Sequence, residues 1–524
     1  MKNFKKIRTQ LSASMLLLGL TQSGFANLVD MAEYQDWEGV QASISSEDVN
    51  AVQPDGMSAL FWAVYYDEAD VVRLLLNAGG DPNAENRFGM TPLIQAAMNG
   101  NGAVISMLLD AGADANARTL QGDTALMNAA KAGTVTGVQA LIEAGAEIDA
   151  RDSYLFQTPL MWAAAENNAE VVRILGENGA DLNARSAELV FAGIRQGGVA
   201  GDFPNGGLTA LHHASRENSI ETVEVLLALG ADPNIPDPQG ISPLRIAAAN
   251  ANLDLAKVLI QGGADINDGS LVDIMEVEYK KMIFVRSAKN YENQTTVRDL
   301  MDLMFEMGVD VDAYPETAIP VVATSFNNNS GTSGRTALYN ATEGLHNDLM
   351  ALLLENGANP NSISKGNAPL SAALYIMSGR RPDAGLYEDE GRKLADLMPT
   401  VQLLLDHGAD VNTLVGVDGA ANGTLLHQAA SYGSDEVVAF LIEQGVDLSV
   451  KDASNRTALD VASGVPAVGS KAPMGGGGGM PTETPIYEET MALLTEAMNA
   501  AGIPIEEYVA PPSDENSEAE TAEG

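Results

Sequence analysis

The chain has 524 residues, a hydrophobic content of 45% and no cysteine. Its formal net charge of −42 excludes a nucleic-acid-binding role and attraction to anionic membranes, because phosphate groups would repel the protein. The lack of cysteine excludes disulfides, thiol catalysis and thiolate metal sites.

Residues 1–26 have the order of a secretory signal peptide. Basic residues from Lys2 to Arg8 precede an apolar run over residues 11–20, and small residues follow up to Ala26. We expect export, with cleavage near Ala26 and a periplasmic or secreted mature protein. A membrane anchor is the alternative, but the apolar run is short for a bilayer span. No later segment is apolar enough to cross a membrane, so no membrane insertion is expected after signal removal.

A motif of Gly, a small residue and an acid or amide recurs ten times in the remaining chain. The first two copies, at Gly79 and Gly112, are 33 residues apart, and longer steps elsewhere indicate insertions. This period predicts stacked helical units that share one continuous core, instead of a single globular core. The other copies begin at Gly145, Gly179, Gly230, Gly263, Gly308, Gly357, Gly408 and Gly445.

Residues 87–118 show what one unit should form. Thr91 can cap a helix whose first residue is Pro92, and Asn99-Gly100 ends that helix. A second amphipathic helix follows, and Gly112 suits the left-handed residue that closes it. The remainder should be an exposed hairpin-like turn.

A second motif, Thr-Pro-Leu-His or a variant of it, opens most units. With the Gly motif it resembles the ankyrin repeat over residues 28–463, with interruptions. The resemblance implies an all-α fold: an ankyrin-repeat α-solenoid with short hairpin fingers, whose fingers and inner helices form a concave face that binds partners. The openings begin at Ser58, Thr91, Thr124, Thr158, Thr209, Ser242, Thr336, Thr424 and Thr457.

The predicted organisation follows from these motifs. A signal peptide (1–26) precedes an N-terminal capping repeat (27–53) and regular repeats (54–185). After a loop insertion (186–207) come further repeats (208–269), a degenerate repeat with a linker (270–333), and repeats with an insertion at 378–399 (334–463). A Gly-rich loop and a closing helix over Glu488–Ala500 (464–502) precede an acidic tail that should be disordered (503–524).

Two segments have two possible interpretations. The insertion at 186–207 falls where a fingertip is expected, so it is either a floppy surface loop or an enlarged finger that contacts a partner. The basic stretch Lys280, Lys281, Arg286, Lys289 and Arg298 is either a solvated helix face, a contact for an acidic partner, or a counter-charge to neighbouring acidic repeats.

No catalytic, cofactor or metal site is expected, and the sequence therefore predicts no enzyme. His212 and His427 stand at the histidine of the opening motif, where the resemblance implies hydrogen bonds between adjacent hairpins. His213, His346 and His407 are also expected to be structural, because no His-Glu-x-x-His spacing occurs. Weak Ca²⁺ binding by loop acids stays open, although no EF-hand loop is visible.

Candidate partner-binding residues come from the variable finger positions and from the ends of the first helices, by analogy with ankyrin grooves. Exposed Tyr, Phe and Met are typical of binding hot spots. Packing against the next finger is an equal alternative for the aromatic residues, and Trp62 and Trp162 are expected in the core. The candidates are Asp55, Met57, Tyr65, Tyr66, Arg87, Phe88, Met90, Met98, Tyr154, Phe156 and Glu166.

The leading hypothesis is an exported, non-enzymatic and monomeric scaffold that binds another protein through its concave face. The negative charge favours a basic partner. The alternatives are an accessory or protective factor for an exported redox or hydrolytic enzyme complex, and a secreted effector.

Overall fold

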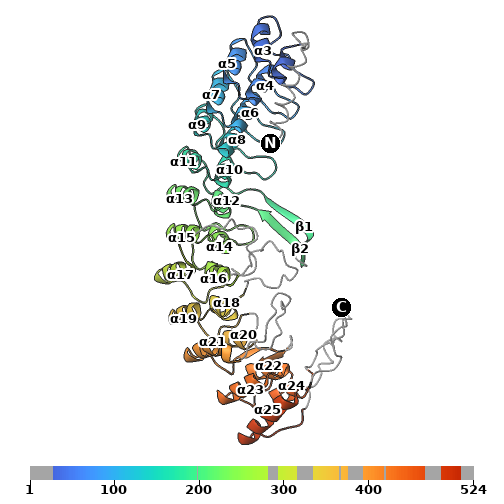
Figure 1. Ribbon diagram of the computed structural model, residues 1–524, viewed down its shortest axis with the longest axis vertical. Helices are drawn as coiled ribbons and strands as arrows, with labels where there is room; N and C mark the ends of the chain where they lie inside the picture. The colour runs from blue at the N-terminus through green and yellow to red at the C-terminus, as the bar shows by residue number, and fades with distance from the viewer. Residues whose placement is uncertain are drawn as a thin grey trace, which may run out of the picture. The chain divides into compact units, whose positions relative to one another are not determined.

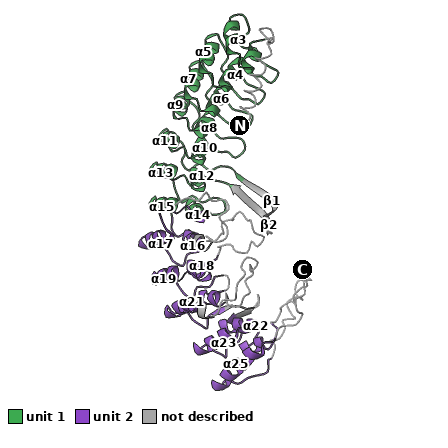
Figure 2. Cartoon of the chain, viewed as in Figure 1, with its two compact units in different colours: residues 1–247, 254–264 green, residues 248–253, 265–524 purple. Residues whose placement is uncertain are grey.

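The computed structural model describes residues 27–196, 199–280, 293–314, 334–364, 367–375, 394–417, 421–466 and 486–508. The chain divides into two compact units, shown in Figure 2. Unit 1 comprises residues 1–247 and 254–264, and unit 2 comprises residues 248–253 and 265–524. The expected signal peptide, the linker at 327–333, the insertion at 378–393, the Gly-rich loop at 467–485 and the tail from 509 lie outside the described residues.

Unit 1 is a stack of helix pairs, seen as two rows in Figure 1. The first helix of each pair forms the inner row and the second forms the outer row. The inner helices are α2 (Leu28–Glu33), α4 (Ala59–Tyr65), α6 (Pro92–Asn99), α8 (Ala125–Ala132), α10 (Pro159–Ala165) and α12 (Ala210–Arg216). The outer helices are α3 (Trp37–Ser43), α5 (Ala69–Asn77), α7 (Gly102–Asp110), α9 (Val135–Glu143), α11 (Ala169–Glu177) and α13 (Ile220–Ala228). Helices α14 (Pro243–Ala249) and α15 (Leu253–Gln261) carry residues of both units.

The opening motif starts the inner helices as the sequence predicts. The Thr91 side chain accepts the backbone N–H of Ile94 at 3.3 Å, and Pro92 occupies the first turn, where a missing N–H costs nothing. Thr124 and Thr158 cap α8 and α10 in the same way. Gly112 has φ +90° after α7, which a side chain would disfavour. These signals fix where each helix begins and ends.

The core of unit 1 consists of thin layers between successive helix pairs. The Leu after each cap is buried, as Leu60, Leu93 and Leu126 show. Small Ala side chains beside them, such as Ala97 and Ala130, let neighbouring inner helices approach closely. Each repeat therefore buries its apolar face only by stacking on its neighbours.

The insertion at 186–207 is a two-stranded antiparallel ribbon, which the sequence left open. Strands β1 (Glu188–Gln196) and β2 (Val199–Gly206) pair with Phe191 opposite Phe203, and a bulge follows Phe191. In Figure 1 the ribbon projects away from the helix rows. At its base, the Ala187 N–H donates to the Leu155 carbonyl at 2.6 Å. The backbone is thus that of an enlarged finger and not of an irregular loop.

Unit 2 is also a stack of helix pairs. The degenerate repeat forms α16 (Ser270–Lys280) and α17 (Val297–Glu306). Then follow α18 (Ala337–Gly344), α19 (Asn347–Glu355), α20 (Pro369–Tyr375), α21 (Leu394–Asp406), α22 (Leu425–Tyr432), α23 (Asp435–Glu443), α24 (Ala458–Ala462) and α25 (Glu488–Ala500). Helix α25 has the bounds predicted for a closing helix and packs against α23 and α24.

Three details of unit 2 differ from the sequence prediction. Residues 394–399, expected within an insertion, are the first turns of α21, which includes Pro399. A second ribbon, β3 (Leu414–Val417) with β4 (Ala421–Thr424), precedes α22. Residues 503–508, expected in the disordered tail, contact the last repeat: Lys451 Nζ lies 3.4 Å from Glu506 Oε2. The all-α class is nevertheless confirmed, since both ribbons are additions to a helical stack.

Among the described residues, no helix is both long enough and apolar enough to span a bilayer.

Candidate protein-binding face

The connections between repeats form short fingers, closed by a backbone hydrogen bond between their two ends. In unit 1 the first four fingers are residues 53–57, 86–90, 119–123 and 152–157. A polar side chain at the start of a finger often organises the turn: Asn86 Oδ1 accepts the N–H groups of Phe88 and Met90. We call the surface formed by these fingers and inner helices α2–α10 the finger face. The predicted partner-binding residues come from these fingers and from the ends of these helices.

Large apolar side chains project from consecutive fingers of this face. Phe88 is 51% exposed, Leu120 73%, Tyr154 72% and Phe156 50%. Leu120 was not predicted, although it stands four residues before the cap Thr124, as Arg87 stands before Thr91. Aligning the fingers on their caps would have found it.

Phe156 holds an uncommon backbone conformation. Its φ is +54°, whereas the preceding fingers have glycine at the corresponding position, at Gly89 and Gly122. A bulky residue in this region is strained. The buried Asp152 stabilises the turn, because its Oδ1 accepts the N–H groups of Tyr154, Leu155 and Phe156 at 2.7–3.0 Å. The chain thus keeps an exposed aromatic ring at a position whose backbone conformation would suit glycine better.

The inner helices add exposed side chains beside the fingers. Tyr65 and Met98 are exposed at the ends of α4 and α6, as predicted. The prediction that Trp62 and Trp162 lie in the core is wrong, since both are only partly buried. They stand four residues after their caps, and this position turns away from the buried stripe that includes Leu60.

Four aromatic rings cluster at the N-terminal end of unit 1. Trp62 stacks on Tyr66 with centroids 5.8 Å apart, and Tyr65 meets both edge-on. Trp37 contacts Tyr66 edge-on at 6.1 Å. The Trp62 indole donates to Gln53 Oε1 at 3.1 Å, and the Tyr66 hydroxyl donates to the Glu33 carbonyl at 3.1 Å. The cluster is therefore held in place by ring contacts and hydrogen bonds within unit 1.

Some candidate residues have a different role from the predicted one. Met57 is buried, with Asn86 Nδ2 3.7 Å from its sulfur, so it cannot contact a partner. Tyr66 is half-buried and Met90 is half-buried. Asp55 is half-buried too, and its carboxylate accepts the Met57 N–H at 3.2 Å. Met57 thus supports the face from within, whereas Asp55, Tyr66 and Met90 keep part of their surface exposed.

Other candidates are exposed and already paired. The Arg87 guanidinium lies 4.8 Å from the Phe88 ring centroid. Lys131 lies 5.2 Å from the Trp162 ring centroid and 4.0 Å from Glu166. The face therefore presents aromatic rings together with charges of both signs.

Charge is distributed unevenly along unit 1. Residues 27–72 contain ten Asp and Glu and no Lys or Arg. Burial raises the pKa of Asp123, and the nearby Asp152 raises it further, whereas Lys131 opposes the shift. The first repeats as a whole would attract cations and repel anions.

The histidines of the opening motif are structural, as expected. His212 Nδ1 accepts the Thr209 N–H at 3.2 Å, and its Nε2 lies 3.2 Å from the Ile241 carbonyl of the next finger. Burial lowers the pKa of His212 to about 4, and burial followed by the nearby Arg216 does the same for His213. Among the described residues no group of His, Asp and Glu is arranged to hold a metal ion.

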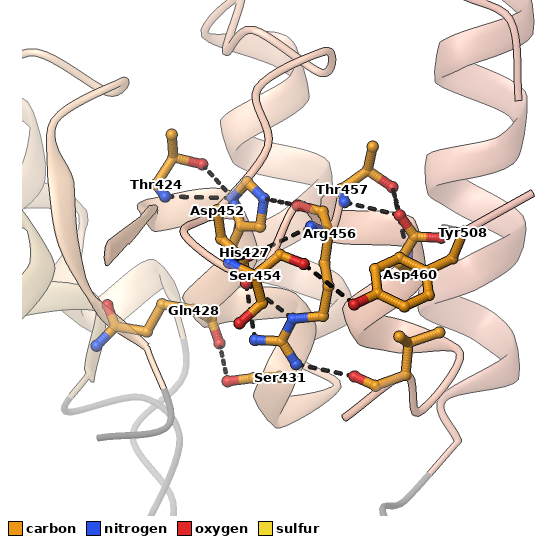
Figure 3. A network of polar contacts seen from close by, with 11 residues as sticks. Thr424, His427, Gln428, Ser431, Asp452, Ser454, Arg456, Thr457, Asp460 and Tyr508 are labelled. Atoms are coloured by element: carbon orange, nitrogen blue, oxygen red, sulfur yellow. Dashed lines mark hydrogen bonds and ion pairs between the residues drawn. The ribbon is translucent and has the colours of Figure 1, made fainter. Parts of the chain in front are cut away.

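The last finger, residues 452–456, is built differently, as Figure 3 shows. The buried Arg456 guanidinium bonds the buried Asp452 carboxylate at 2.7 and 2.8 Å and the Val465 carbonyl at 2.8 Å. His427 Nε2 lies 3.0 Å from the Arg456 carbonyl. The Tyr508 hydroxyl donates to the Ser454 carbonyl at 3.1 Å. This finger is polar inside and covered by the C-terminal segment.

Comparison with known proteins shows the same repeat in several contexts. The chain is 26% identical over 298 residues to the E3 ubiquitin-protein ligase KEG of Arabidopsis thaliana, covering 49% of this chain and 16% of the ligase. It is 29% identical to the mouse B-cell lymphoma 3 protein homolog, covering 49% of this chain and 48% of that protein. The crystal structure of the Bcl-3 ankyrin repeat domain matches 42% of this chain and 94% of that domain, with 28% identity and a TM-score of 0.35. The chain thus spans less than half the length of these two curated relatives.

Family models cover more of the chain. Residues 28–119, 113–186 and 188–270 match a model of three ankyrin repeats, and residues 404–462 match a model of many ankyrin repeats. Together these matches include more than half of the 524 residues. Ankyrin repeats typically mediate protein–protein interaction and are generally not catalytic. The chain belongs to the ankyrin-repeat family.

Proposed function

We propose that this protein is an exported, non-enzymatic scaffold that binds another protein through the finger face of unit 1. The observation that carries the proposal is the row of exposed apolar side chains on consecutive fingers: Phe88, Leu120, Tyr154 and Phe156. Contiguous apolar patches on soluble proteins mark interaction sites, and a row of large apolar side chains on consecutive fingers is a candidate for such a patch. The signal-like order of residues 1–26 supports export, with cleavage near Ala26 and a periplasmic or secreted mature chain.

The face has the features of a preformed binding surface. Its fingers are fixed by hydrogen bonds to one another, such as the Leu120 N–H to the Phe88 carbonyl at 3.1 Å. Little backbone entropy would be lost on binding, so less of the favourable contact free energy is offset by the cost of ordering the fingers. The strained Phe156 fits this interpretation, because uncommon backbone conformations concentrate at functional sites.

The charge of the N-terminal repeats limits the partner. With ten acids and no Lys or Arg over residues 27–72, these repeats favour a partner with Lys or Arg around an apolar contact. The acidic surface does not fit nucleic acid. We expect a one-to-one complex whose association rate falls as salt is added.

The experiment compares two double variants of the full chain. Phe88→Ala with Tyr154→Ala removes two rings from the finger face. Met307→Ala with Ile486→Ala removes two exposed apolar side chains from unit 2 and is the matched control. Proteins captured by chemical crosslinking from the exported fraction are quantified for each chain. We expect at least a tenfold loss for the first variant and none for the control, with circular dichroism unchanged.

Equal capture by both variants would place the binding surface elsewhere. The captured protein also separates the alternatives: an exported redox or hydrolytic enzyme supports an accessory or protective role, and a protein from another cell supports a secreted effector. A mass of the exported chain that still includes residues 1–26 would contradict signal cleavage.

A further inference from the structure

The third finger of unit 1 holds a half-buried carboxylate, that of Asp123, directly before the cap Thr124. Its backbone is bonded within the finger, since the Asp123 N–H donates to Thr119 Oγ1 at 3.2 Å and its carbonyl accepts the Thr119 N–H at 3.0 Å. Among the described residues, no hydrogen bond or ion pair reaches the carboxylate itself. Burial and the nearby Asp152 both raise its pKa, so the folded chain disfavours the charged form. The finger therefore carries a charge that its described surroundings do not pair.

The repeat pattern places this carboxylate beside the Trp162 ring of the next repeat. Gln157 stands directly before its helix cap, and its Nε2 lies 3.4 Å from Nε2 of His213, four residues after the next cap. Asp123 and Trp162 hold the same two positions one repeat earlier. The Trp162 indole N–H donates to Asp152 Oδ2 at 3.4 Å, which orients the ring. An acid and an aromatic ring thus meet on the finger face.

Lys131 shows that a cation can lie over this ring. Its Nζ is 5.2 Å from the Trp162 ring centroid and 4.0 Å from a Glu166 carboxylate oxygen, while its side chain is 54% exposed. It also lowers the pKa of Asp123, so the same ammonium group acts on all three neighbours. Neither contact is close, and exposed pairs of this kind hold a lysine weakly. Lys131 can therefore leave the ring at little cost when a better-fitting cation arrives.

We propose that Asp123 and Trp162 anchor an arginine side chain of the partner protein, and that Lys131 holds the place of its charge until the partner binds. This site rests on the proposed function, because it gives the partner's cation a place on the finger face. A guanidinium fits better than an ammonium, since its plane stacks on an indole and its paired N–H groups match both oxygens of a carboxylate. The exposed Leu120 and Tyr154 stand on the third and fourth fingers and would help to exclude water from the contact.

The test follows the three tryptophans of the chain by fluorine NMR after incorporation of fluorotryptophan. Trp162→Phe assigns the Trp162 signal. Three peptides are titrated into the full chain: acetyl-Gly-Arg-Gly-amide, and the same peptide with lysine or citrulline in place of arginine. We expect the arginine peptide to shift the Trp162 signal more than those of Trp37 and Trp62, and to bind about fivefold more tightly than the lysine peptide. Citrulline has the shape of arginine without its charge and should not bind.

Two variants should change the affinity in opposite directions. Lys131→Ala removes the competing cation and should tighten binding of the arginine peptide by about threefold, whereas Asp123→Asn should weaken it by about tenfold. Asp110→Asn removes an exposed carboxylate from the outer helix α7 and is the charge-matched control, with a change of less than about twofold. Because no described residue bonds the Asp123 carboxylate, Asp123→Asn should unfold at no lower denaturant concentration than the parent chain.

Three outcomes would overturn the arginine site: equal binding of the arginine and lysine peptides, an unshifted Trp162 signal, or an Asp123→Asn chain that binds as the parent does. The proposed function survives each of them if Phe88→Ala with Tyr154→Ala still loses the captured protein. If that double variant captures the protein as well as the parent does, the proposed function fails by itself, and with it the role of Asp123 and Trp162 as an anchor for the partner.

Discussion

The fourth finger of unit 1 and the last finger of unit 2 share a backbone design but use it in opposite ways. Each begins with a buried aspartate, Asp152 or Asp452, whose Oδ1 accepts N–H groups of the turn. Around Asp152 the turn exposes Tyr154 and Phe156, whereas around Asp452 it buries Arg456. The shared aspartate sets the turn, and the other residues of the finger decide whether it exposes aromatic rings or buries an ion pair.

The largest expected effect comes from removing the buried carboxylate of the last finger (452–456). Asp452→Ala leaves the Arg456 guanidinium buried without its carboxylate, which should lower the free energy of unfolding by about 3–5 kcal/mol. Denaturant unfolding followed by circular dichroism measures the change.

A second variant tests whether the cost comes from unpaired charge. Asp452→Asn with Arg456→Met removes both charges, keeps an oxygen that accepts the N–H groups of residues 454 and 456, and should recover most of the lost stability. Glu170→Ala, which breaks an exposed pair with Arg173, should cost no more than about 1 kcal/mol. A small loss for Asp452→Ala would mean that water reaches Arg456 and that the last finger is not closed.

The second prediction concerns acid. The pKa of both His212 and His213 is about 4 in the folded chain, against an ordinary value of 6.5. The unfolded chain therefore binds more protons as pH falls from 6.5 towards 4, and stability present above pH 6.5 is lost progressively over that window. Between pH 7 and pH 5 the loss should be about 2 kcal/mol for each histidine.

His213→Gln isolates one of the two contributions. It should reduce the pH-dependent loss of unit 1 by about half, whatever its effect at pH 7. Denaturant midpoints at several pH values measure it. An unchanged pH dependence would mean that His213 titrates normally and that its surroundings are wetter than the structure shows.

The fold was largely predictable because its signals are local. The caps at Thr91 and Thr124 and the left-handed Gly112 each act within one turn of helix, so the sequence states them directly. The face was harder to predict because exposure depends on the neighbouring repeat. Met57 is covered by the next finger, and the Tyr66 hydroxyl donates to the Glu33 carbonyl of the preceding repeat; neither contact is visible in a single repeat.

The packing of residues 503–508 on the last finger could not be predicted from composition. Residues 503–508 are rich in acid and proline and read as a disordered tail, yet Tyr508 finds an acceptor on a finger 54 residues earlier. Such a contact depends on where α25 ends in space. The signal that could have found it is the lone tyrosine after the closing helix.

The third prediction separates the effect of Phe156 on stability from its effect on binding, in the fourth finger (152–157). Phe156→Gly should raise the free energy of unfolding by about 1 kcal/mol, because glycine accepts φ +54° without strain. The same change removes an exposed ring and should weaken capture of the partner. Asn455, at φ +61° in the matching position of the last finger, is the control, since asparagine tolerates this region and Asn455→Gly should be nearly neutral.

Thermal unfolding and the crosslinking assay measure the two effects on the same chains. A Phe156→Gly chain that is less stable would show that the ring packs within the stack and is not kept for a partner.

The smallest expected effect concerns an Asn or Asp that recurs in each unit and bonds the backbone of the following repeat. Asn83 and Asn116 each accept an N–H from the following repeat, from Asp114 and Glu147, and each donates Nδ2 to a glycine carbonyl there at 2.9–3.0 Å. Asp149 accepts the Asp181 N–H at 3.0 Å but has no amide to donate to Gly179. Asp149→Asn should therefore add one hydrogen bond and about 0.5–1 kcal/mol of stability.

The corresponding position in unit 2 is Asp312, which accepts the Asn359 N–H at 3.1 Å. Asp312→Asn should stabilise unit 2 to a similar extent, and the reverse change Asn116→Asp should destabilise unit 1 by the same amount. Denaturant midpoints with the slopes held equal resolve effects of this size. If both Asp→Asn changes are neutral while Asn116→Asp is costly, repulsion between neighbouring carboxylates, and not the missing amide, governs this edge, and added salt should then reduce the cost.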